Sequence, residues 1–196
     1  MDLSKYKIMP SLPSPLPSSS HRRNASAGGA STPFISFEET KKTLIAINQS
    51  LFEQTKMTLI ELNQSLLNSS VDLNYDTYDL LSSNDMSCIG PETNHNIVIG
   101  KEFHKYYFDV FSSNNIYDVE GETGMATVTK TKVTMVKPHV QIMCDGNAAV
   151  ISYVRLTQQT SPGKPPVTTQ QSETRVWEKR NNEWVNVHFH KSDYKS

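Results

Sequence analysis

The chain has 196 residues, with 19 Lys and Arg against 20 Asp and Glu, so its formal net charge is −1. This length suits one domain of ordinary size with a terminal extension. The balanced charge argues against the basic surfaces that bind nucleic acid or anionic membranes. No apolar run approaches the roughly 20 residues of a membrane-spanning helix. We therefore expect a cytoplasmic protein with neither a nucleic-acid nor a membrane partner.

Residues 1–35 differ in composition from the rest of the chain. The stretch "MPSLPSPLPSSSHRRNASAGGASTP" (9–33) is rich in Pro, Ser, Ala and Gly and has few large apolar residues. Such a composition cannot bury enough apolar surface to offset the entropy lost on ordering. We predict a disordered tail over residues 1–35 and a folded domain over residues 36–196.

Two short motifs in the tail are candidate partner sites. "KIMPSLP" (7–13) has the basic-x-x-Pro-x-x-Pro spacing of a polyproline ligand for a Src-homology-3 domain. "RRNAS" places Arg23 three residues before Ser26, the spacing that basophilic kinases prefer. Phosphorylation of Ser26 would add about two negative charges to the tail. The alternative is an unmodified, solvated linker.

A long amphipathic helix is predicted from about Phe37. Ser36 and Glu39 have the spacing of a capping box at its start. "TLIAINQSL" (43–51) is nearly repeated as "TLIELNQSL" (58–66), fifteen residues and thus about four helical turns later, so one apolar stripe continues through both copies. We interpret the repeat as a local duplication that lengthens one helix. The stripe consists of Leu44, Ile47, Leu51, Leu59, Leu62 and Leu66.

The remainder of the chain predicts two shorter helical segments and then a sheet. "NSSVDLNYD" (68–76) ends the long helix, "YDTYDLLSS" (75–83) suits a short second one, and "KEFHKYYFDVF" (101–111) is rich in aromatic residues. From Thr127 the apolar residues alternate with period two, and turn residues separate the segments, which is typical of antiparallel strands. Helices followed by antiparallel strands predict an α+β fold with helices on one face of a curved sheet.

The last strand carries a His-x-His pair in "WVNVHFHKS" (184–192). Because side chains alternate along a strand, His188 and His190 are expected to share a face with Trp184 and Asn186. Two histidines could supply metal ligands, but a catalytic site needs a third, and only His139 is available on a strand. We favour an ordinary pair on the sheet face and predict no metal site. The opposite face would carry Val185, Val187, Phe189 and Lys191.

Two arginines, Arg155 in "SYVRLTQ" and Arg175 in "SETRVW", lie within apolar strand segments, where an unpaired guanidinium is costly. If these strands line one concave face, the arginines could converge with Lys191 on a pocket that binds a carboxylate. The alternative is that each arginine pairs with a nearby acid such as Glu173 or Glu178. The spacing leaves both interpretations open.

Several kinds of chemistry lack any signal in the sequence. Cys88 and Cys144 lie in apolar stretches, so we expect free, buried thiols rather than a disulfide. The chain has no P-loop, nucleophile elbow, Cys-x-x-Cys motif or protein-kinase signature. We therefore predict neither a cofactor nor kinase activity.

Three stretches, "NIVIGKEFHKYYFD", "KPHVQIMCDGNAAVISYVRLTQ" and "QSETRVWEKRNNEWVNVHFHKS", closely resemble the association (hub) domain of calcium/calmodulin-dependent protein kinase II. The resemblance runs from about Asp85 to Ser192. It implies a cone-shaped α+β fold of the nuclear transport factor 2-like superfamily, with a long N-terminal helix packed in a strongly curved antiparallel sheet. It also implies self-assembly of dimers into two stacked rings of about 12–14 subunits in total, or co-assembly with full-length kinase subunits.

The resemblance further implies a cationic ligand pocket for acidic groups. Its residues here would be His104, Arg155, Arg175 and, in place of a third arginine, Lys191. This chain has Ile89-Gly90-Pro91 where the family has Phe-Glu-Pro, so we expect an acidic group to be missing at the pocket mouth. The segment 114–136 is longer than the family pattern.

We favour a non-catalytic oligomerisation hub. The alternative is a small isomerase, a cyclase or a ligand-binding protein of the same cone fold. In such an enzyme His104 would act as general base, and Arg155 and Arg175 would polarise an oxyanion. A third hypothesis is a passive adaptor whose tail recruits a partner and whose domain multiplies it.

Overall fold

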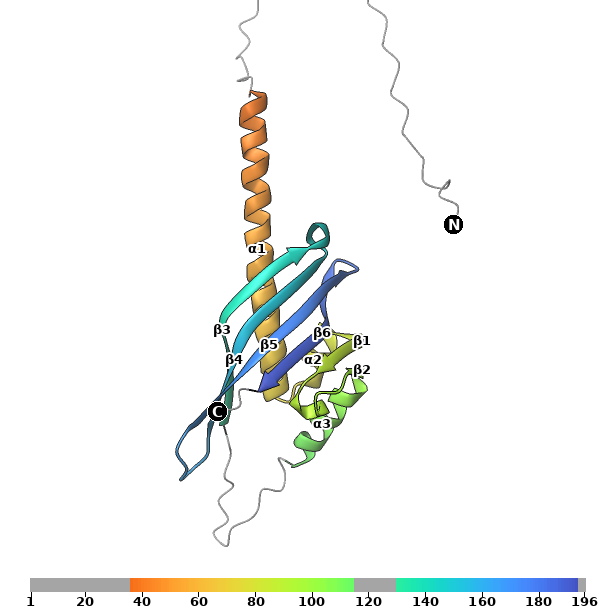
Figure 1. Cartoon of the computed structure of the whole chain (residues 1–196), viewed down its shortest axis with the longest axis vertical. Coiled ribbons are helices and arrows are strands. Elements are labelled where there is room, and N and C mark those ends of the chain that lie inside the picture. Colours follow the sequence, from red (N-terminus) through yellow and green to blue (C-terminus); the bar gives the residue numbers. More distant parts are fainter. Residues whose placement is uncertain (1–35, 115–129, 194–196) are drawn as a thin grey trace, which may run out of the picture. The chain divides into compact units, whose positions relative to one another are not determined.

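The computed structural model describes residues 36–114 and 130–193 (Figure 1). The predictions for the tail, residues 7–13 and Ser26 lie outside the described residues, as does most of the long segment 114–136. The helices are α1 (Phe37–Val71), α2 (Tyr75–Leu81) and α3 (Glu102–Asn114), with short 3-10 turns η1 (Pro91–Thr93) and η2 (Cys144–Gly146). The strands are β1 (Ser82–Ile89), β2 (Val98–Ile99), β3 (Lys130–Met143), β4 (Ala148–Thr160), β5 (Val167–Arg180) and β6 (Glu183–Asp193).

The strands form one sheet in the order β2-β1-β6-β5-β4-β3. Short turns join β3 to β6 in sequence, so these four strands pair antiparallel. The predicted α+β fold, with a long helix against an antiparallel sheet, is confirmed. The predicted strand segments "TKTKVTMV" (129–136) and "HVQIMC" (139–144) belong largely to one strand, β3, which is interrupted near Lys137, a residue with positive φ. The pattern did not predict β1, which extends the sheet by pairing parallel to β6.

Helix α1 lies across the sheet, but only its C-terminal half is buried (Figure 1). Leu59, Leu66 and Leu67 are completely or almost completely buried in the main core, beside Ile151 and Trp177. None of the described helices is long and apolar enough to cross a membrane. The core therefore forms between the second half of α1 and the inner face of the sheet.

One of the two expected buried thiols is in fact at the surface. Cys88 on β1 is buried, as predicted, whereas Cys144 is exposed. The prediction for Cys144 was wrong because the apolar run of β3 ends at Met143, and Cys144 begins the η2 turn. Residues in such a turn leave the sheet and face solvent.

Candidate functional site

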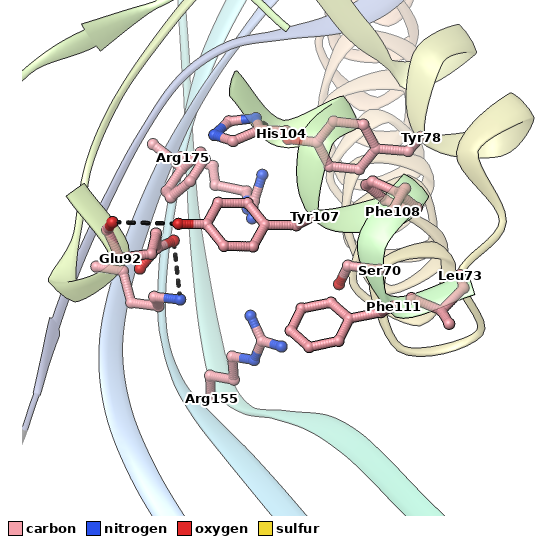
Figure 2. A pocket seen from close by; sticks show the side chains of 12 residues that line it. Ser70, Leu73, Tyr78, Glu92, His104, Tyr107, Phe108, Phe111, Arg155 and Arg175 are labelled. Carbon is pink, nitrogen blue, oxygen red and sulfur yellow. Dashed lines mark hydrogen bonds and ion pairs between the residues drawn. The ribbon is translucent and has the colours of Figure 1, made fainter. Parts of the chain in front are cut away.

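A pocket of about 370 Å³ lies between α3 and the inner face of the sheet (Figure 2). Aromatic side chains form much of its wall, including Tyr78, Tyr107, Phe108, Phe111 and Phe189. The structure brings together all four residues that the resemblance implied, namely His104, Arg155, Arg175 and Lys191. Their use as a binding site for an acidic group stays a prediction.

A bulge in β6 explains how Phe189 and Lys191 reach this pocket. Trp177 of β5 pairs with Asn186, but its neighbour Val176 pairs with His188, so Val187 is an extra residue in β6. A bulge of this kind reverses the alternation of side chains beyond it. Phe189 is consequently buried beside the pocket, as predicted.

The same bulge shows that part of the predicted strand pattern was wrong. Asn186 is fully buried and accepts a hydrogen bond from Arg175, and Trp184 packs against the main core. Both residues therefore share the inner face with Phe189, rather than the outer face with His188. His188 instead lies against β1, where its Nδ1 is 2.8 Å from Ser87 Oγ. No cluster of three potential metal-binding side chains occurs in residues 36–114 and 130–193.

Arg175 is held by a buried ion pair. Its Nη2 lies 2.6 Å from Glu173 Oε1, its Nε donates to the same oxygen, and its Nη1 donates to Asn186 Oδ1 over 3.0 Å. The guanidinium carbon also lies 4.6 Å from the centre of the Phe189 ring. Burial alone would raise the pKa of Glu173, but the charges of Arg175 and Arg155 outweigh it and keep the pKa below its ordinary value. Of the two interpretations of Arg175, the structure shows the ion pair.

Arg155 has more hydrogen-bonding capacity to spare than Arg175. Its Nη1 is 3.7 Å from Glu173 Oε2, a long contact, and its buried Nε has no partner among the described residues. The Glu173 Oε2 atom likewise has no hydrogen-bond partner in this part of the chain. Figure 2 shows Arg155 and Tyr107 extending into the pocket from opposite walls. Because Arg155 lines the pocket and its contact with an acid is long, its guanidinium is the strongest candidate to meet a ligand.

An acidic group is present at the pocket mouth, contrary to the expectation from Ile89-Gly90-Pro91. Glu92 lies two residues after Gly90 and forms an ion pair of 3.1 Å with Lys191. A Cβ atom at position 90 would lie 2.7 Å from Glu92 Oε2. Gly90 therefore leaves room for the Glu92 carboxylate. The sequence pattern did not indicate Glu92, because the family's acidic residue aligns with Gly90.

His104 is buried and engaged by two neighbours. Its Nδ1 lies 2.5 Å from the Tyr78 hydroxyl, and its Nε2 lies 3.2 Å from Cys88 Sγ. Burial, together with the positive charges of Arg175 and Lys191, lowers the pKa of His104 to about 4. Burial also raises the pKa of the Cys88 thiol to about 11. At neutral pH the histidine is uncharged and the cysteine is a thiol, so this group is a hydrogen-bonded part of the wall. Tyr78 and Cys88 lie on elements that sequence patterns did not connect to His104.

A family model described as the calcium/calmodulin-dependent protein kinase II association domain matches residues 55–195. The chain is 39% identical over 118 residues to the calcium/calmodulin-dependent protein kinase type II alpha chain of Drosophila melanogaster, which is 60% of this chain and 20% of that relative. It is 35% identical over 118 residues to the type II kinase of Caenorhabditis elegans, covering 60% of this chain and 14% of the relative. The chain thus spans at most about a fifth of the length of these relatives.

Solved structures of hub domains from the same kinase family are also similar to this chain. The hub homology domain of this kinase from Chlamydomonas reinhardtii is 37% identical, with a TM-score of 0.59 over 71% of this chain and 97% of that chain. The association domain of the C. elegans kinase is 31% identical, with a TM-score of 0.58 over 71% and 96% of the two chains. An NTF2-like protein from Cytophaga hutchinsonii, at 14% identity, has a TM-score of 0.52 over 71% and 98%. The cone-shaped fold is confirmed.

Proposed function

The chain belongs to the calcium/calmodulin-dependent protein kinase II association domain family, and we propose that it is a non-catalytic hub that joins copies of itself into a closed assembly. The observation that carries this proposal is the match to nearly the whole length of a solved hub domain. A domain of this family has an oligomerisation role. A closed ring of more than two copies requires at least two contact surfaces on each copy, and the family match over residues 55–195 includes the entire sheet that would present them.

We propose that this assembly is a double ring of about 12–14 copies. Full-length kinase subunits with the same domain could enter such a ring, since the relatives are kinases of this family. This chain would then dilute or position their kinase domains. The polyproline motif at 7–13, phosphorylation of Ser26 and a cytoplasmic location stay predictions.

The mass of the purified chain in solution tests the hub directly. We expect a mass of roughly 265–310 kDa, because about 12–14 copies of a 22.1 kDa chain close the double ring. Light scattering after gel filtration, or native mass spectrometry, measures it. A single species of one or two chains at micromolar concentration would contradict the proposal. Mixing with a labelled full-length kinase and following the label into the same peak tests co-assembly separately.

For the pocket, we propose that an acidic group binds between Arg155 and Lys191. The guanidinium of Arg155, whose contact with Glu173 is long, and the charge of Lys191 supply the attraction, while the aromatic wall accepts an apolar body. Arg175 plays a structural part because Glu173 and Asn186 already engage all three of its guanidinium nitrogens. Glu92 competes for Lys191, so a ligand must displace that carboxylate.

Benzoate and its uncharged analogue benzamide test this assignment by calorimetric titration. Benzoate should bind more tightly than benzamide, and Arg155→Gln should weaken benzoate binding about 10-fold or more, since a charge-assisted hydrogen bond contributes about 1.5–3 kcal/mol. Glu92→Gln should tighten binding because it frees Lys191. The control is Lys105→Gln, which removes an exposed cation paired with Asp109 outside the pocket. Equal affinity for the two compounds, or an unchanged Arg155→Gln variant, would refute the proposal.

The enzyme alternative gains no support from the geometry around His104. Both ring nitrogens are engaged by Tyr78 and Cys88. A base whose pKa is about 4 is also poorly matched to proton abstraction near neutral pH. We therefore retain the hub as the proposed function.

A further inference from the structure

Most of the N-terminal part of α1, residues 37–57, extends beyond the sheet (Figure 1). Its large apolar side chains are exposed. We name this segment the α1 extension; most of it precedes residue 55, where the family match begins. Five large apolar side chains, each about half exposed, form the α1 stripe: Leu44, Ile45, Ile47, Leu51 and Phe52. A helix of about 20 residues is marginal in water without packing, so a stripe of this size indicates a partner.

The internal repeat shows what kind of surface this stripe is. Residues 43–51 differ from residues 58–66 only by Ala46 in place of Glu61 and Ile47 in place of Leu62. In residues 58–66, the second half of the internal repeat, the repeated leucines are buried in the core. The repeated asparagine, Asn63, accepts a hydrogen bond from Trp177. The α1 extension therefore repeats the side chains of a buried helix face, yet these side chains are about half exposed.

The stripe is symmetric about Asn48. Leu44 and Ile45 lie four and three residues before it, and Leu51 and Phe52 lie three and four residues after it. We propose that the α1 extension pairs antiparallel with the α1 extension of a second copy of this chain, with the two-fold axis at Asn48. In this register Leu44 meets Phe52 of the second copy, and Ile45 meets its Leu51. The two Asn48 amides face one another and can satisfy each other's donors and acceptors, as a central asparagine does in paired helices.

The charges beside the stripe favour the antiparallel direction. Glu38 and Lys56 are eighteen residues apart, which is about five helical turns, so they lie on the same flank of α1. Antiparallel pairing about Asn48 brings Glu38 of each copy within about 3 Å, along the axis, of the level of Lys56 of the other copy. In a parallel pair, Glu38 of one chain would instead lie level with Glu38 of the other chain, and Lys56 with Lys56. Opposite charges therefore meet at both ends of the antiparallel pair.

The end of the paired segment also finds an apolar contact. Phe37, which is 80% exposed, lies eleven residues before Asn48, so it reaches the level of Leu59 in the second copy. A groove between α1 and β3, lined by Phe52, Lys56 and residues 140–143, begins about 5 Å along the axis before that level. Met143 in this groove is 41% exposed. In the proposed pair, the first turn of the second copy's α1 packs against this edge of the sheet, which continues the α1 stripe onto the sheet.

A second copy suits this surface better than the chain's own residues 1–35. That segment has prolines at 10, 13, 15 and 17, and proline interrupts a helix, whereas the stripe runs along a straight helix for several turns. The proposed pairing of the α1 extensions is a different contact from those that would form the ring. Its residues lie mostly outside residues 55–195, the range that matches the family.

Cysteine cross-linking of the full chain tests both the contact and its direction. In a Cys144→Ser background, which removes the exposed native thiol, three variants are compared: L44C, F52C and the double variant L44C/F52C. Within one helix, positions 44 and 52 are about 12 Å apart, too far for a disulfide. We expect mild oxidation to yield at least ten times more covalent dimer from the double variant than from either single variant. The matched control A46C/E53C, on the opposite side of the helix, should give no more than the single variants.

Each alternative outcome would overturn the proposal. Efficient cross-linking of L44C alone would show a parallel pair, and no cross-link in any variant would show that copies do not meet here. If residues 37–57 exchange their amide hydrogens slowly but no variant cross-links, residues 1–35 of the same chain would be the segment that covers the α1 stripe. The mass of the unmodified chain distinguishes failure of the pairing from failure of the hub. If the double variant cross-links but the unmodified chain has the mass of a dimer, the pairing is supported and the ring is contradicted. If the unmodified chain has the mass of a ring but no variant cross-links, the ring is supported and the pairing is contradicted.

Discussion

Replacing Glu173 with glutamine is expected to lower the free energy of unfolding by about 3–5 kcal/mol. Glu173 and Arg175 are 2% and 4% exposed, and their ion pair is 2.6 Å long. Removing the negative charge leaves the Arg175 guanidinium buried with only neutral partners, Tyr153 and Asn186. Desolvation of that charge then goes uncompensated. Urea unfolding followed by tryptophan fluorescence, at one fixed protein concentration because assembly contributes to stability, measures the change.

The pH dependence gives a second signature of Glu173. Its pKa in the folded state is below the ordinary value, which is about 4.3 for a glutamate in an unfolded chain. The ionised carboxylate therefore contributes stability that is present above about pH 4.3 and is lost as the pH falls through the depressed folded pKa. Glu173→Gln lacks this contribution, so its deficit relative to the original chain should shrink under acidic conditions.

Two further variants test whether the loss of stability comes from the buried ion pair rather than from the loss of any acidic residue on β5. Glu178→Gln, on the same strand, removes an exposed acid that pairs with the exposed Arg180, and it should leave the unfolding midpoint unchanged. The double variant Glu173→Gln/Arg175→Met removes both charges and should be more stable than Glu173→Gln alone. If Glu173→Gln unfolds at the same denaturant concentration as the original chain, the ion pair does not hold the pocket wall.

Leu66→Ala is expected to lower the free energy of unfolding by about 2–5 kcal/mol, the usual cost of a cavity in a packed core. Leu66 is 1% exposed and packs in the main core beneath the sheet. Its counterpart in the repeat, Leu51, is 54% exposed. Leu51→Ala should therefore change the stability of the domain much less, although the two leucines have nearly the same sequence neighbours.

The same unfolding experiment compares the two leucine variants. Circular dichroism should show that Leu51→Ala keeps its helix content, and any loss of association in this variant would support pairing through the α1 extension. Equal destabilisation by Leu51→Ala and Leu66→Ala at low protein concentration would contradict the packing described for α1. It would mean that the first copy of the repeat is also buried within a single chain.

Local sequence patterns predicted the order and type of most elements. The 3.6-residue period of residues 44–66 and the period of two in residues 148–191 reflect one buried face each, and such patterns depend on local geometry. Specific stretches such as "YVRLTQ" and "VHFHK" were sufficient to identify the family and with it the positions of Arg155, Arg175 and His104. Local pattern and family resemblance together therefore predicted the fold class and the wall of the pocket.

Which side chains contact one another depends on how the elements pack in three dimensions. The bulge at Val187 arises from pairing between β5 and β6, and no local pattern reports how many residues oppose one another across two strands. Glu92 meets Lys191 although ninety-nine positions separate them, and Glu173 neutralises Arg175 because both point to the inner face. The two copies of the repeat have almost the same pattern, yet one is buried and the other exposed. The physical reason is that burial requires a second surface, and the sheet is long enough to cover only one of them.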